Sequence, residues 1–154
     1  MKYDEVGFTS EGVECAGWHF TAANDTLDTP AGRPVVVMAH GLAGTMDSGL
    51  APFAEALASA GLDVLAFDYR GFGASQGSPR QTVSMTGQLA DYRAAMAAAA
   101  RLPGVDPQRL VLWGVSLSGG HDGGRSAAGR RPAAARALGR VALRRPRARG
   151  RRRP

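Results

Sequence analysis

Ser116 stands in the segment whose residue types and spacing are best suited to covalent chemistry. Residues 113–120 have the sequence WGVSLSGG and end a short apolar run. A serine on a sharp turn between a strand and a helix presents its hydroxyl as a nucleophile, and the crowded backbone of that turn requires small neighbours. Gly114 and Gly119 supply this room, while Ser118 stands where the pattern G-x-S-x-G has its second glycine. A Ser/Gly-rich turn without reactivity is the alternative for this segment.

Two further segments follow apolar runs in the same way. His40 to Gly44 (HGLAG) comes directly after the run at 35–39, and residues 67–75 (FDYRGFGAS) continue the run that begins at Val64. The glycines of the second segment also match part of a dinucleotide-binding loop. That interpretation is disfavoured, because such a loop opens a helix at once and follows the first parallel strand, whereas residues 76–79 (QGSP) keep the chain irregular.

Together the three segments resemble the α/β-hydrolase superfamily, in its serine aminopeptidase-like and dienelactone hydrolase-like branch, over residues 1–121. The resemblance implies a serine hydrolase that cleaves an ester, amide or other acyl bond through Ser116. It also implies that the backbone N–H groups of Leu42 and Leu117 stabilise the oxyanion. No cofactor and no metal are expected, and the substrate is a small-molecule acyl compound or a peptide. Four residues are expected to support these motifs, namely His40, Gly41, Gly114 and Gly119. The imidazole of His40 is expected to order its own loop.

The elements around these motifs predict an α/β fold with a mostly parallel sheet. Residues 3–22 are predicted to form two antiparallel strands around a turn at 9–12. The continuous apolar runs at 35–39, 64–67 and 110–113 are typical of strands that helices cover on both faces. Strands that alternate with helices through short connections predict parallel pairing.

Two helices are predicted between these strands. For the first, Asp47 or Ser48 is the expected N-cap, Gly61 the stop, and the apolar face is expected to comprise Leu50, Phe53, Leu57 and Ala60. The second helix is expected to end near 102–104. Its apolar face is expected to comprise Met85, Leu89, Tyr92, Met96 and Ala99.

Residues 122–154 differ in composition from the rest of the chain. Their twelve arginines against one aspartate give a net charge of +11, which leaves −5 of the overall +6 for residues 1–121. Of these 33 residues, 28 are Arg, Ala, Gly or Pro, which predicts a disordered, low-complexity tail. An alternative function is binding of nucleic acid or another anionic surface through this tail. The segment holds no aromatic residue that could stack on bases.

The catalytic acid and histidine of the hydrolase pattern have no evident counterpart. In this superfamily both follow the serine along the chain, and after Ser116 only His121 and Asp122 are of the right types. Both would lie on the helix behind the serine, so neither is expected to reach it. The chain is therefore expected to be an inactive, truncated hydrolase, with a tail that a shifted reading frame in a GC-rich gene would explain. A non-catalytic hydrolase-like partner domain is a further alternative.

The remaining signals concern location and the single cysteine. Cys15 is expected to be a small buried hydrophobic residue. The acidic start of the chain lacks the apolar stretch of a signal peptide, and the longest apolar run, 94–100, is far shorter than the roughly 20 residues of a membrane span. The sequence therefore predicts a cytoplasmic protein without membrane contacts.

Overall fold

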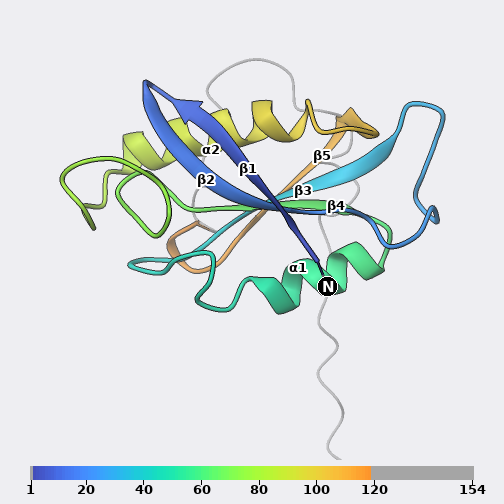
Figure 1. Ribbon diagram of the computed structural model, residues 1–154, viewed down its shortest axis with the longest axis horizontal. Helices are drawn as coiled ribbons and strands as arrows, with labels where there is room; N and C mark the ends of the chain where they lie inside the picture. The colour runs from blue at the N-terminus through green and yellow to red at the C-terminus, as the bar shows by residue number, and fades with distance from the viewer. Residues whose placement is uncertain (1, 119–154) are drawn as a thin grey trace, which may run out of the picture.

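A five-stranded sheet lies between two helices in the computed structural model, which describes residues 2–118 (Figure 1). The strand order is β1-β2-β4-β3-β5. Antiparallel pairs join β1 to β2 and β2 to β4, whereas β3 is parallel to both β4 and β5. The predicted α/β fold with antiparallel N-terminal strands is thus confirmed. The elements are β1 (Asp4–Ser10), β2 (Val13–Phe20), β3 (Arg33–Ala39), α1 (Ala51–Ser59), β4 (Asp63–Phe67), α2 (Met85–Ala99) and β5 (Val105–Gly114).

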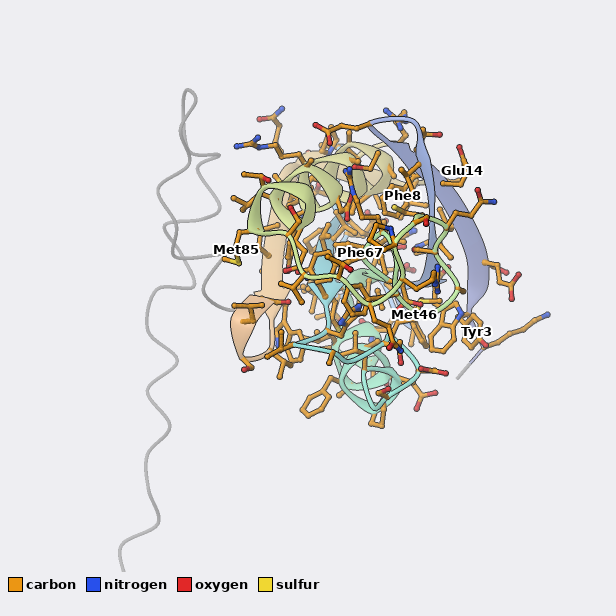
Figure 2. All side chains as sticks on the ribbon, turned by 90° about the vertical axis from the view of Figure 1, so that its left-hand side faces the viewer. Tyr3, Phe8, Glu14, Met46, Phe67 and Met85 are labelled. Carbon is orange, nitrogen blue, oxygen red and sulfur yellow. The ribbon has the colours of Figure 1, made fainter. Side chains whose placement is uncertain are left out.

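The central strands alternate their side chains between two apolar layers. Val35 and Val37 of β3 belong to the cluster that includes Tyr92 of α2, whereas Val36 and Met38 belong to the cluster under α1. Strand geometry explains this division, because successive side chains point to opposite faces of a sheet. Figure 2 looks along the sheet and shows the two helices on opposite sides of it. β3 and β4 are buried on both faces, as their continuous apolar runs predicted. The same prediction is wrong for the run at 110–113, because β5 is the last strand of the described sheet and its Leu112 is 36% exposed.

Helix α1 differs from its prediction at its start and on its buried face. Its N-cap is Leu50, without a side-chain capping bond. The predicted caps fail because Asp47 and Ser48 both bond the hydroxyl of Thr45 in the preceding turn. The buried side chains of the helix itself are Ala54 and Ala58, because only small residues fit this close to the sheet. The expected apolar face is therefore wrong at Phe53, which is 55% exposed, and at Ala60, which is also exposed.

Helix α2 begins at a side-chain cap and buries polar as well as apolar residues. The Oγ of Ser84 accepts a hydrogen bond from the N–H of Gly87, 3.2 Å away. Of the predicted apolar face, Tyr92 and Ala99 are buried, but Met85 at the first position is 49% exposed. Asp91 is fully buried on this helix and accepts hydrogen bonds from the backbone and side chain of Arg70.

Several predicted features lie outside the described residues. They are Gly119, His121, Asp122 and the tail 122–154, together with its proposed contacts to nucleic acid. Within residues 2–118, neither helix has the length and apolar character needed to cross a membrane.

Candidate active site

The loops that follow β3, β4 and β5 gather at one end of the sheet, on the left of Figure 1. The carboxyl ends of parallel strands share an edge, and in open α/β sheets this is where ligands bind. The three chemistry-bearing segments of the sequence therefore meet at one place. The opposite edge of the sheet holds the amino ends of the same strands.

Ser116 occupies a strained turn just beyond β5. Its φ is +55°, a left-handed conformation that costs an L-residue roughly 1–2 kcal/mol. The turn is closed by a hydrogen bond of 3.1 Å from the N–H of Ser118 to the carbonyl of Val115. The side chain of Ser116 is exposed. A strained, exposed serine at the carboxyl end of a strand is the geometry that a nucleophile elbow requires.

The loop after β3 packs directly against this turn, and its glycine makes the approach possible. A Cβ atom at Gly41 would lie 3.1 Å from the carbonyl oxygen of Val115 and 3.3 Å from the Cβ of Ser116. These distances are shorter than ordinary contacts, so a side chain at position 41 would require the loop or the turn to move by a few tenths of an ångström. Gly41 therefore sets how closely the neighbouring Leu42 approaches Ser116.

His40 is buried beneath this loop and bonds its backbone. The Nδ1 atom of His40 lies 2.9 Å from the carbonyl oxygen of Gly41 and carries the proton of this bond, because a carbonyl only accepts. The Nε2 atom faces the N–H of Tyr69 at 3.5 Å and Oδ1 of Asp68 at 3.5 Å. The imidazole is 3% exposed and packs edge-on against the ring of Tyr69. These contacts hold the loop rather than present the imidazole to solvent.

Asp68, at the end of β4, joins two of the loops through its buried carboxylate. Oδ1 accepts a hydrogen bond of 2.6 Å from the N–H of Met46, and Oδ2 accepts one of 2.9 Å from the N–H of Ala74. The chain comes so close at Gly73 that a Cβ there would lie 1.9 Å from Oδ2. Asp68 thus fixes the loop after β3 to the loop after β4.

The other predicted site residues occupy the same edge with different exposure. The side chain of Leu42 is 63% exposed, Leu117 is half-buried at the start of the turn's helix, and Gly114 ends β5. The N–H of Leu42 donates to no backbone carbonyl within residues 2–118. In the same residues, no three His, Cys, Asp or Glu side chains are placed to hold a metal ion.

Three residues that organise this edge were not predicted to have a role from the sequence. Asp68 and Tyr69 lie in the quoted segment 67–75, and Ser118 in the serine motif, yet their contacts join positions 22 to 78 residues apart. The one available signal was the Asp that directly follows a buried strand. A serine in place of a glycine gives no indication of its partner.

The sequence of this chain matches a known protein family. The sequence profile described as serine aminopeptidase, S33, matches residues 30–134, which include all three loops. The chain belongs to the serine aminopeptidase S33 family. Over 117 residues it is 43% identical to the quorum-quenching protein AidA of Acinetobacter baumannii, and these cover 76% of this chain and 37% of that protein. The thiohydrolase aneE of Aspergillus aculeatus is 37% identical over 118 residues, with 76% and 35% covered.

Solved structures place this S33 family member in the α/β-hydrolase fold. The α/β-hydrolase GrgF from Penicillium sp. sh18 matches with a TM-score of 0.70 and 27% identity, over 79% of this chain and 40% of that one. An esterase from Pyrococcus furiosus matches with a TM-score of 0.61 and 26% identity, over 76% and 41%. The chain therefore spans well under half of the relatives it matches. Its described residues correspond to the N-terminal part of the fold.

Proposed function

We propose that Ser116 is the nucleophile of a hydrolase that cleaves an ester, thioester or other acyl bond. The exposed, left-handed Ser116 in contact with Gly41 is the observation that carries this proposal. Its Oγ attacks the substrate carbonyl, the leaving group departs with a proton, and water then releases the acid from the acyl-enzyme. Relatives named as a thiohydrolase and an esterase support acyl compounds as the substrate class.

The oxyanion of this reaction is assigned to two backbone N–H groups, those of Leu42 and Leu117. Their separation is governed by the contact of Gly41 with the turn. His40 acts here as a positioning residue through the carbonyl of Gly41. A trans peptide directs its C=O and N–H oppositely, so the bond to this carbonyl orients the N–H of Leu42.

The 154-residue chain is proposed to lack hydrolase activity by itself. Of the described histidines, His40 bonds the loop backbone and His19 bonds Asp63 at the opposite edge of the sheet. Neither is available to accept the proton of Ser116, and a serine without a base is a weak nucleophile. The acid and base of the active protein are therefore assigned to residues other than those described here.

A chimera tests the proposed nucleophile. Residues 1–118 are joined to the segment of the Acinetobacter relative that follows its matched region, and hydrolysis of p-nitrophenyl esters is measured. Ser116→Ala should lower kcat/KM by about 10³-fold or more, whereas Ser59→Ala, at an exposed serine of α1, should leave it unchanged. A folded chimera that is equally active with alanine at position 116, or that never labels at Ser116 with a serine-directed phosphonate, would contradict the proposal.

A further inference from the structure

Ser118 is a buried serine at the position where the common motif has glycine. Its side chain is 1% exposed. Its Oγ contacts two groups from distant parts of the chain, the backbone carbonyl of His40 and the hydroxyl of Tyr69, the latter at 2.8 Å. The three residues follow β5, β3 and β4 respectively. The hydroxyl of Ser118, on the loop after β5, thus contacts the other two loops of the candidate active site.

The direction of these hydrogen bonds follows from the donors and acceptors present. The carbonyl of His40 can only accept, so Ser118 donates its single proton there. The hydroxyl of Tyr69 then donates to the free lone pair of Ser118. Bonds arranged in such a chain polarise and strengthen one another in a buried setting. Tyr69 is itself held by ring contacts with Phe67 and with His40.

The backbone after β3 is consequently fixed at two successive peptides. Ser118 holds the carbonyl of His40 from the side of the turn. The carbonyl of Gly41 accepts from the imidazole of His40 at 2.9 Å and from the N–H of Gly44 at 3.2 Å. Because peptides are planar and trans, fixing these two carbonyls fixes the direction of the N–H of Leu42.

We propose that Ser118 and Tyr69 are positioning residues, whose hydroxyl chain holds the His40–Leu42 backbone against the turn that bears Ser116. The inference rests on the proposed function, in which Ser116 and the N–H of Leu42 must face one reacting carbonyl. A glycine at 118 would let the loop approach the turn but could not bond it. Ser118 instead joins the turn to the loop by a hydrogen bond, which fixes the direction as well as the distance between them.

Amide hydrogen exchange in the full 154-residue chain tests this proposal. It is read by NMR at two reporter amides that border the link, those of Gly44 and of residue 118, and is expressed as protection factors, which remove the intrinsic exchange rate of each residue type. Loss of one buried hydrogen bond should speed their exchange about five- to tenfold in Ser118→Ala. Amides of the β3 and β4 core should be unchanged. Tyr69→Phe should act in the same direction. Exchange of these amides in the double variant should be only slightly faster than in Ser118→Ala, because the tyrosine acts through the serine.

A matched control comes from Ser10, a buried serine at the end of β1 whose Oγ accepts a hydrogen bond from Nη2 of Arg70 instead. Ser10→Ala should leave the amides of Gly44 and residue 118 unchanged. Unchanged reporters in Ser118→Ala, additive effects of the two substitutions, or an equal rise throughout the core would each overturn the proposal. The series is repeated with Ser116→Ala, where the same pattern is expected. Its outcome is therefore independent of whether Ser116 reacts.

Discussion

The Nε2 atom of His19 lies 2.6 Å from Oδ1 of Asp63, at the edge of the sheet opposite Ser116. Oδ2 of the same carboxylate accepts a 2.6 Å hydrogen bond from Nε of Arg33. Asp63 is fully buried at the start of β4. Three strands, β2, β3 and β4, are joined by this one carboxylate.

Asp63 makes the stability of the chain dependent on pH. Burial by itself raises the pKa of this carboxyl, but the hydrogen bonds from His19 and Arg33 outweigh burial and lower it. A lowered folded-state pKa stabilises the fold above the unfolded pKa of about 3.9, and this stabilisation is lost as the pH falls through the folded value. Asp63→Asn should cost about 2 kcal/mol near pH 7, because the partly exposed Arg33 loses its charged partner.

Urea unfolding followed by circular dichroism from pH 7 to pH 3 measures this effect. The difference between wild type and Asp63→Asn should shrink as the pH falls below about 4. Asp47→Asn, at an exposed carboxylate in the turn before α1, provides the control and should show little difference at any pH. A difference that stayed constant over this range would contradict the assigned role of Asp63.

Gly73→Ala should disrupt the contact between the loops after β3 and β4. The new Cβ would displace the carboxylate of Asp68, 1.9 Å away, and with it the bonds to Met46 and Ala74. Gly12→Ala is the matched variant, because Gly12 also has a positive φ but no atom near its would-be Cβ. We expect Gly73→Ala to cost about 1–3 kcal/mol more in unfolding free energy than Gly12→Ala. Equal costs would mean that Asp68 moves freely.

Cys15 should be unreactive in the folded chain. Burial, and secondly the negative charge of Asp91, raise the pKa of its thiol to about 11, and it is 3% exposed. At pH 8 its thiolate fraction is then about 10²-fold below that of an ordinary cysteine. Reaction with a disulfide reagent should follow unfolding, whereas a cysteine placed at exposed Ala56 in a Cys15→Ala background should react at once. Rapid labelling of native Cys15 would contradict this prediction.

The sequence predicted the strands where burial itself leaves a pattern. The runs at 35–39 and 64–67 are buried on both faces, so every residue is apolar and the strands are evident. β5 instead begins at Val105, five residues before its apolar run, because Val105 pairs with Arg33 across the sheet. The start of α1 was missed for a similar reason: Asp47 and Ser48 had a better local partner than the helix end.

In the candidate site, too, local patterns could be predicted from the sequence and contacts between distant residues could not. The positions of Ser116 and Gly41 could be predicted, because small residues beside a strand end are a local signal. The link from Tyr69 through Ser118 to His40 could not, because it depends on which strands are neighbours in the sheet. Tyrosines also occur in hydrophobic cores that carry no site. Tyr69 is distinguished from them only by the partner of its hydroxyl, Ser118.

Ser116→Ala should not change the esterase activity of the isolated 154-residue chain. An unactivated serine hydroxyl reacts slowly, and activation requires an imidazole within hydrogen-bond reach. The imidazole of His40 bonds the carbonyl of Gly41, and that of His19 is held by Asp63 at the far edge. Hydrolysis of p-nitrophenyl acetate by wild type and variant, each corrected for buffer, should therefore agree within error. A rate that depends on Ser116 would show that a base reaches it in this chain, and His121 would be the first residue to substitute.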